Sequence, residues 1–230
     1  MQQLINDLAQ ELSQLANSEE RDLRLLTRIT ERSARIGVVG LGYVGLPLAI
    51  GWACAGFLVT GIDIDPLRVD MCLQSKSWIA DVPSEDLSAL VCEGQLTATT
   101  DTSVFTELDV ITICVPTPLN EAKQPDIGAI LKVVDAIASS FHPGQLIVLE
   151  STTFPGTTDE CILPRLQQSG LKVGEEFFLG YSPERIDPGN MHYCLRNTPK
   201  VIAGVTSCCT QLTKALYETI VDTVIPVSST

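Results

Sequence analysis

Three closely spaced glycines are the residues of this chain whose pattern points most directly to chemistry. Gly40, Gly42 and Gly45 form a Gly-x-Gly-x-x-Gly motif, which is typical of a loop that binds a pyrophosphate. The first glycine of such a motif permits a tight turn, the second lets the backbone approach the phosphates, and the third allows close helix packing. The N–H groups at the start of the following helix then face the anionic oxygens.

An acidic residue stands where a dinucleotide site requires one. Asp63 follows Gly45 by 18 residues and ends an apolar run. A carboxylate at this position accepts hydrogen bonds from the adenosine ribose hydroxyls. It also repels a 2′-phosphate, which favours NAD over NADP. The alternative is a glycine-rich turn in another kind of α/β protein, and the acid in this register argues against it.

The elements around the motif alternate between strand and helix. We predict strands at 35–39, 57–62, 95–99, 110–115, 146–150, 177–180 and 201–203. We predict helices at 46–55, 66–73, 127–139, 158–168 and 207–221, with Gly56 ending the first and Asp65 capping the second. This alternation predicts an α/β fold, a Rossmann-like, doubly wound, mostly parallel sheet with helices on both faces. The proline-rich stretch 115–125 is predicted to be a loop at a strand end.

Composition excludes several classes of function. The net charge of −13 argues against a nucleic-acid partner, which requires clustered lysine and arginine. The eight cysteines include no Cys-x-x-Cys pair, and His142 and His192 lack metal-ligand spacing, so we expect no metal. We expect most of the cysteines to be buried and reduced in a cytoplasmic protein. No apolar run is long enough to span a membrane.

The first 33 residues differ from the rest of the chain. Leu4, Ile5, Leu8, Leu12 and Leu15 recur at helical spacing between polar residues, which predicts an amphipathic helix. This leader could pack on its own domain or form a contact between subunits. The predicted organisation is therefore a helical leader over 1–33 and a dinucleotide-binding domain over 34–230.

Four longer motifs carry a resemblance to a known family. They are Val38-Val-Gly-Leu-Gly-Tyr-Val-Gly-Leu-Pro-Leu48, Cys114-Val-Pro-Thr-Pro118, Glu150-Ser-Thr-Thr-Phe-Pro-Gly156 and the segment 181–190. In this order they resemble the UDP-glucose/GDP-mannose dehydrogenase family, over residues 34–230. Segment 181–190 is similar to the branch that acts on UDP-N-acetylhexosamines. Segment 77–83 resembles the UDP-N-acetylglucosamine enzymes more than the UDP-N-acetylmannosamine enzymes.

The resemblance implies an activity and a set of site residues. Members of the family oxidise the C6 alcohol of a nucleotide sugar to a carboxylate with two NAD. The implied cofactor contacts are Tyr43 and Val44 at the pyrophosphate, Asp63 and Arg68 at the adenosine, and Thr117 and Thr152 near the ribose and nicotinamide. The implied substrate contacts are Glu184, Arg185 and Ile186.

The chemistry of these side chains suits the implied roles. Thr152 can hydrogen-bond the reacting oxygen or a water, and Glu184 can orient that water or accept a proton. Arg185 can meet a phosphate with its planar set of donors. Structural alternatives are that Thr117 only shapes its loop and that Glu184 pairs with Arg185.

The sequence also departs from the family. It contains no Gly-Gly pair. In the family the nucleophilic cysteine follows such a pair, so none of the cysteines of this chain matches it. The family's catalytic lysine and its second half are not expected in this chain either. Pro188 stands where UDP-glucose dehydrogenases have a second glutamate. We expect the NAD-binding half of a UDP-N-acetylglucosamine 6-dehydrogenase that serves surface polysaccharide synthesis, in a complete protein that is a homodimer or larger. UDP-N-acetylmannosamine and UDP-glucose are alternative substrates, and an NAD-binding module without turnover or an inert truncation are alternative functions.

Overall fold

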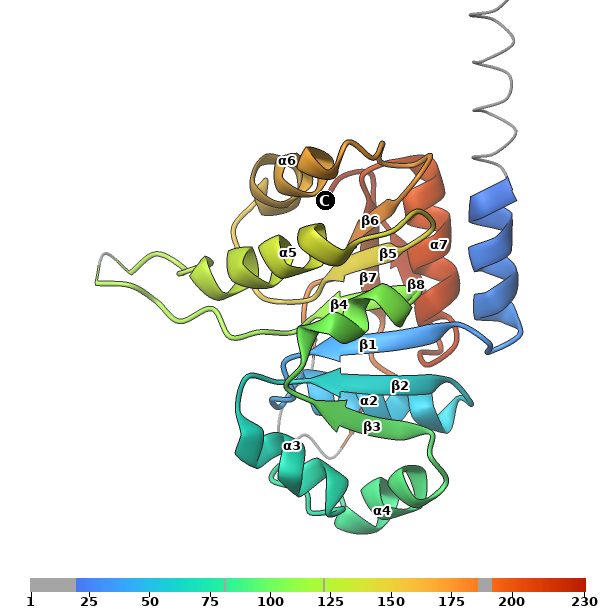
Figure 1. Ribbon diagram of the computed structural model, residues 1–230, viewed down its shortest axis with the longest axis vertical. Coiled ribbons are helices and arrows are strands. Elements are labelled where there is room, and N and C mark those ends of the chain that lie inside the picture. The colour runs from blue at the N-terminus through green and yellow to red at the C-terminus, as the bar shows by residue number, and fades with distance from the viewer. Residues whose placement is uncertain (1–19, 81, 122, 186–191) are drawn as a thin grey trace, which may run out of the picture.

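The computed structural model describes residues 20–80, 82–121, 123–185 and 192–230, and an eight-stranded sheet lies at its centre (Figure 1). The strands lie in the order β3-β2-β1-β4-β5-β6-β7-β8. All neighbours are parallel except β6 and β7, so the predicted Rossmann-like sheet is confirmed. The strands are β1 (Arg35–Val39), β2 (Leu58–Ile62), β3 (Leu96–Thr99), β4 (Val110–Ile113), β5 (Leu146–Leu149), β6 (Phe178–Tyr181), β7 (Lys200–Gly204) and β8 (Val224–Pro226).

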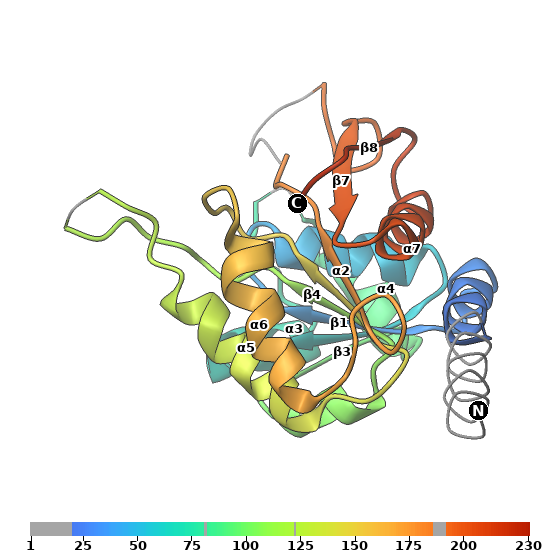
Figure 2. The ribbon, with the colours of Figure 1, turned by 90° about the horizontal axis from the view of Figure 1, so that it is seen from above.

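Helices cover both faces of the sheet (Figure 2). One face carries α2 (Gly45–Cys54), α3 (Pro66–Leu73), α4 (Ser84–Cys92) and α7 (Ser207–Tyr217). The other carries α5 (Gly128–Ser140), α6 (Leu163–Leu166) and the helical turns η1 (Thr102–Glu107), η2 (Thr157–Ile162) and η3 (Gln167–Ser169). Because the sheet is covered on both sides, its central strands are mostly apolar.

Strand β5 shows how the sequence builds this double core. Leu146 and Val148 join the core cluster on the α2 face, whereas Ile147 and Leu149 join the cluster on the α5 face. All four side chains are fully buried. Alternate residues of a strand point to opposite faces, and so a continuous apolar run fits a strand between two helical layers.

Two predicted helix boundaries are confirmed by their local geometry. Gly56 follows α2 in the left-handed region with φ of 97°, which glycine adopts at little cost at the end of a helix. Asp65 caps α3 by accepting a hydrogen bond from the Leu67 N–H at 2.9 Å, and Pro66 occupies the first helical position.

Two other predicted helices are present but differ in detail. The helix predicted at 158–168 is present as a continuous helical run, but its hydrogen-bond pattern changes from η2 through α6 to η3, and Pro164 lacks the N–H that would bond one turn back. The helix predicted to end at 221 ends at Tyr217, and a tight turn then carries Ile220 and Val221 into the core. The elements α4, η1 and β8 were not predicted.

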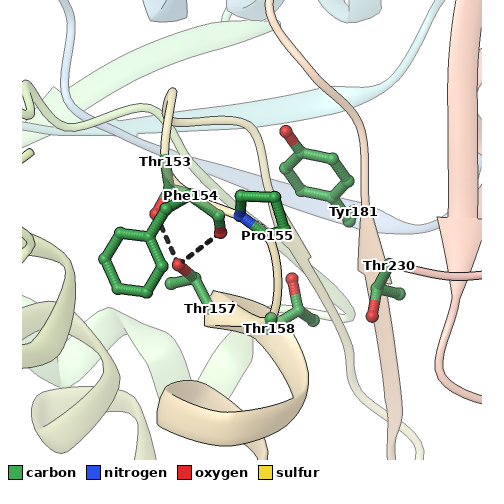
Figure 3. A pocket seen from close by; sticks show the side chains of 8 residues that line it. Thr153, Phe154, Pro155, Thr157, Thr158, Tyr181 and Thr230 are labelled. Carbon is green, nitrogen blue, oxygen red and sulfur yellow. Dashed lines mark hydrogen bonds between the residues drawn. The ribbon is translucent and has the colours of Figure 1, made fainter.

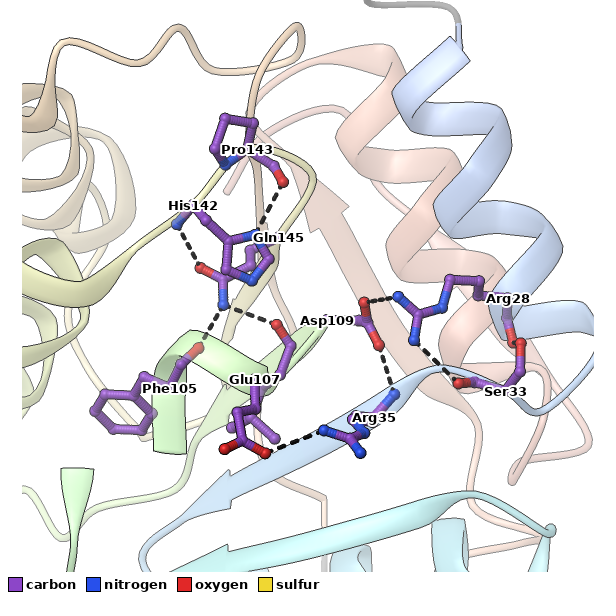
Figure 4. Close-up of polar contacts among 10 residues, drawn as sticks. Arg28, Ser33, Arg35, Phe105, Glu107, Asp109, His142, Pro143 and Gln145 are labelled. Carbon is purple, nitrogen blue, oxygen red and sulfur yellow. Dashed lines mark hydrogen bonds and ion pairs between the residues drawn. The ribbon is translucent and has the colours of Figure 1, made fainter. Parts of the chain in front are cut away.

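A helix over residues 20–30 packs on its own domain, beside α7 (Figure 1). Leu25 and Ile29 are buried in the core cluster of the α2 face. Arg28 pairs with Asp109, whose second oxygen accepts a hydrogen bond from the Arg35 N–H at 2.7 Å (Figure 4). The leucine pattern that predicted the leader lies within residues 4–15, outside the described residues.

The cysteines are more exposed than the sequence suggested. Only Cys72, Cys114 and Cys209 are buried, while Cys54, Cys92 and Cys194 are exposed. All eight thiols are unpaired. Among the described residues, no group of histidine, cysteine and acidic side chains has an arrangement that could hold a metal. None of the helices in the described part of the chain has the length and apolar character that crossing a bilayer requires.

Candidate cofactor and substrate site

The glycine motif forms the turn from β1 into α2, and two of its glycines are required by packing. Gly40 has φ of 93°, and a Cβ there would lie 2.7 Å from the Cys114 carbonyl oxygen. A Cβ on Gly45 would lie 1.8 Å from the Gly40 carbonyl oxygen. A Cβ on Gly42 would meet nothing within 4 Å. The backbone at Gly42 is therefore open to the approach of a ligand.

The amino end of α2 offers backbone donors to an anion. Val44 is the N-cap residue and supplies no side-chain hydrogen bond, and the first turn of the helix has no acidic residue. The first N–H groups of a helix lack partners within the helix, although the Leu46 N–H here donates to the Gly42 carbonyl oxygen at 3.1 Å, and the helix dipole favours negative charge at this end. Tyr43 lies beside this end of the helix and is 57% exposed. This end of the helix is suited to a pyrophosphate.

Asp63 directly follows β2 and holds the glycine loop in place. Its residue is 4% exposed, and its Oδ2 accepts the Leu41 N–H at 2.7 Å. Its Oδ1 accepts the Asp65 N–H at 2.9 Å, and Arg68 Nη1 lies 3.3 Å from Oδ2. A carboxylate has about four acceptor positions, so Asp63 can hold the loop and still accept from a ribose. The bracing role was not predicted.

The loops that follow β4 and β5 are joined at Thr117. Its hydroxyl donates to the Thr152 carbonyl oxygen at 2.7 Å. Ser151 reinforces the junction, because its hydroxyl contacts the Ile113 and Val115 carbonyl oxygens at 3.1 and 2.8 Å. Thr152 itself is exposed. The structure therefore brings together the two threonines that the sequence singled out, at the carboxyl edge of the sheet.

A small pocket lies next to Thr152 (Figure 3). Its volume is about 210 Å³, and its lining includes Phe154, Thr158, Tyr181 and Thr230. Pockets for whole drug-sized ligands occupy about 300–1,000 Å³. By that comparison, this pocket has room for only part of a nucleotide or a sugar nucleotide.

The segment that carries Glu184 and Arg185 lies at the same edge of the sheet. Ser182, just after β6, donates its N–H to the Leu149 carbonyl oxygen at 3.0 Å and its hydroxyl to the Val201 carbonyl oxygen at 2.9 Å. The Arg185 N–H donates to Glu184 Oε1 at 2.6 Å, and Arg185 is exposed. Ile186 lies outside the described residues.

A buried charged cluster beneath this edge was missed by the sequence reasoning. The side chains of Glu150 and Lys200 are 0% and 4% exposed, and Lys200 Nζ lies 2.7 Å from Glu150 Oε2. Tyr217 donates its hydroxyl to Glu150 Oε1, and Lys200 also donates to the Pro183 carbonyl oxygen at 3.2 Å. Burial raises the pKa of Glu150, and Lys200 opposes that rise. The cluster therefore joins the Glu150–Thr152 segment to the segment that carries Glu184. A signal existed in Glu150, an acid that directly follows an apolar strand.

Residues 34–221 match the NAD-binding domain of the UDP-glucose/GDP-mannose dehydrogenase family. The chain belongs to this family. The match includes the glycine loop, Asp63 and all the described candidate site residues. The recognition made from the four motifs is therefore confirmed.

Relatives within the family have different named substrates. A UDP-N-acetyl-D-glucosamine 6-dehydrogenase from Pseudomonas aeruginosa is 35% identical over 83% of this chain and 44% of its own length. An NDP-N-acetyl-D-galactosaminuronic acid dehydrogenase from Ralstonia solanacearum is 38% identical over 80% of this chain and 44% of its own length. The structure of a UDP-N-acetyl-mannosamine dehydrogenase from Staphylococcus aureus matches with a TM-score of 0.79 and 32% identity, over 85% of this chain and 48% of that chain. This chain thus spans less than half the length of these relatives.

The residues present in this domain fit NAD. Open backbone at Gly42, an amino end of α2 without a side-chain cap and a carboxylate at the end of β2 lie along one edge of the sheet. The strand order 3-2-1-4-5-6 reverses between β1 and β4, which is where such sheets bind dinucleotides. The family and the geometry agree on NAD as the cofactor.

Proposed function

We propose that this chain supplies the NAD-binding half of an enzyme that oxidises the C6 alcohol of a UDP-N-acetylhexosamine to the uronic acid. UDP-N-acetylglucosamine is the favoured substrate, and the product would serve surface polysaccharide synthesis. The observation that carries the proposal is the meeting of Thr117, Thr152 and the Glu184 segment at the edge of the sheet that bears the glycine loop.

The cofactor would lie across the ends of β1, β2 and β4. Gly40, Gly42 and Gly45 would admit the pyrophosphate, and Tyr43 and Val44 would flank it. Asp63 would accept hydrogen bonds from the adenosine ribose, with Arg68 beside it. Thr117 and Thr152 would lie near the second ribose and the nicotinamide. NAD would supply the acceptor for the hydride that leaves C6.

The reacting end of the substrate would lie between Thr152 and Glu184. The Thr152 hydroxyl would hydrogen-bond the C6 oxygen or a water, and Glu184 would orient that water or accept its proton. Arg185, which is exposed, would contact a phosphate of the sugar nucleotide, and Ile186 would line the same site. The oxidation of the alcohol to a carboxylate would pass through an aldehyde, which a thiolate would capture covalently in the second step. We assign this thiolate to a residue outside this chain.

NADH formation is the test of this proposal. The purified 230-residue chain is mixed with NAD and one sugar nucleotide at a time: UDP-N-acetylglucosamine, UDP-N-acetylmannosamine or UDP-glucose. Absorbance at 340 nm follows NADH, and calorimetry measures NAD binding in a separate experiment. NADH formed with UDP-N-acetylglucosamine supports the proposed substrate. NADH formed only with UDP-glucose contradicts it.

A second candidate function is an NAD-binding module without turnover of its own. The absence of a Gly-Gly pair and of the cysteine that follows it in the family favours this candidate for the chain by itself. NAD binding without NADH formation, for any of the three sugars, is its expected outcome.

The homodimer or larger assembly of the complete protein stays a prediction.

A further inference from the structure

Leu41, between the first two glycines of the motif, is fixed on three sides. Its side chain is fully buried against β2, where a Cβ on Gly61 would lie 2.7 Å from Leu41 Cδ2. Its N–H donates to Asp63 at 2.7 Å. Its carbonyl oxygen accepts a hydrogen bond from the indole Nε1 of Trp78 at 3.0 Å. The last contact joins the glycine loop to a segment 37 residues away in sequence.

The segment that carries Trp78 is itself held in place. It connects α3 to α4, and the Ser77 N–H donates to Ser84 Oγ at 3.1 Å. The Ser77 hydroxyl oxygen accepts the Ile79 N–H at 3.2 Å. Trp78 and Ile79 pack against the core cluster of the α2 face. The indole therefore reaches Leu41 from a framework that other contacts define.

The direction of one peptide group connects Trp78 to the cofactor. The Leu41 carbonyl and the Gly42 N–H belong to a single planar, trans peptide, so they point in opposite directions. A bond that holds the carbonyl toward Trp78 consequently fixes the direction of the Gly42 N–H. Gly42 is the glycine at which the backbone can approach a pyrophosphate, and the space beside it is open.

We propose that Trp78 is a positioning residue for NAD, because its indole N–H holds the Leu41–Gly42 peptide in the orientation that binds the pyrophosphate. The inference rests on NAD as the cofactor of this domain. It assigns to segment 77–83 a role in cofactor binding. Asp63 and Trp78 then hold the two ends of Leu41, one through its N–H and the other through its carbonyl.

The test is the substitution Trp78→Phe, which keeps an aromatic ring in the core but removes the N–H. Calorimetry or NMR titration measures the dissociation constants of NAD, ADP-ribose and adenosine. We expect NAD and ADP-ribose, which both contain the pyrophosphate, to bind about 2- to 12-fold more weakly, the usual net effect of one hydrogen bond. Adenosine, which has no phosphate, should bind unchanged. Amide exchange at Leu41, whose N–H donates to Asp63, should become faster.

The matched control is Ile79→Val, which trims the same segment without removing the bond to Leu41. It should leave all three affinities and the exchange at Leu41 unchanged. If Trp78→Phe binds NAD as well as the unsubstituted chain does, the positioning role is wrong. Equal weakening of all three ligands together with a lower Tm would also overturn it, because that pattern indicates general destabilisation. No NAD binding by the unsubstituted chain would instead overturn the cofactor assignment itself.

Discussion

Replacement of Lys200 by methionine removes the positive charge that faces Glu150 in the protein interior. Both side chains are almost completely buried and their charged atoms lie 2.7 Å apart. Removal of one member of a buried ion pair leaves the other charge uncompensated, which costs about 3–5 kcal/mol. For a domain of this size, 1 kcal/mol corresponds to about 2–4 °C in Tm. We therefore expect the Tm of Lys200→Met to fall by about 6–20 °C.

Urea unfolding followed by tryptophan fluorescence measures this loss. Trp52 reports on the cluster, because its ring centroid lies 5.7 Å from that of Tyr217, the residue that donates to Glu150. The control is the double variant Glu150→Gln, Lys200→Met, which buries no charge at this site. It should recover much of the lost stability, since it leaves no uncompensated charge in the interior.

The loss should depend on pH in a defined direction. Burial raises the pKa of Glu150, and Lys200 opposes that rise, so the variant should have a still higher Glu150 pKa. A carboxyl group with a higher pKa in the folded state than in the unfolded state binds its proton more tightly when folded, so stability is gained as the pH falls. The deficit of Lys200→Met should therefore shrink from pH 8 to pH 5. Unchanged stability at pH 8, or a deficit that grows on acidification, would refute this reasoning.

Three further predictions concern the cofactor site, the leading helix and the thiols. Asp63→Ala should weaken NAD binding about tenfold or more, since a hydrogen bond to a charged group contributes about 1.5–3 kcal/mol; calorimetry with an unchanged NAD affinity would contradict this. Arg28→Ala should lower stability by about 1 kcal/mol and expose residues 20–30 to protease, whereas Arg24→Ala, at an exposed pair, should do neither. Burial raises the pKa of Cys72 to about 11. Iodoacetamide at pH 8 should therefore modify the exposed Cys92 and leave Cys72 intact until the chain unfolds. Mass spectrometry of the peptides measures both modifications.

The sheet could be predicted because its signals are local. Each apolar run ends near a glycine, proline or acid that marks the boundary, as Gly56 and Asp65 show. α4 could also have been found, because Pro83 and the acids Glu85 and Asp86 mark its start. The change of hydrogen-bond pattern within the 158–168 helix was less evident, since a proline is tolerated in the first turn of a helix and its position in the turn is not visible from sequence.

The candidate site was only partly predictable, because several of its contacts join distant segments. The glycine motif predicted the loop, but the contacts that fix Leu41 come from residues 22 and 37 positions away in the sequence. Lys200 lies 50 residues from Glu150, and nothing near Lys200 in the sequence marks it as buried. A charged side chain is buried only when its partner is brought to it by the fold, and pairing of this kind has no local pattern.

The most direct test of NAD as the cofactor is a calorimetric titration of the 230-residue chain with NAD and, separately, with NADP. We expect saturable binding of NAD at one site per chain, with NADP much weaker because Asp63 repels its 2′-phosphate. Equal binding of the two dinucleotides, or binding of neither, would contradict it.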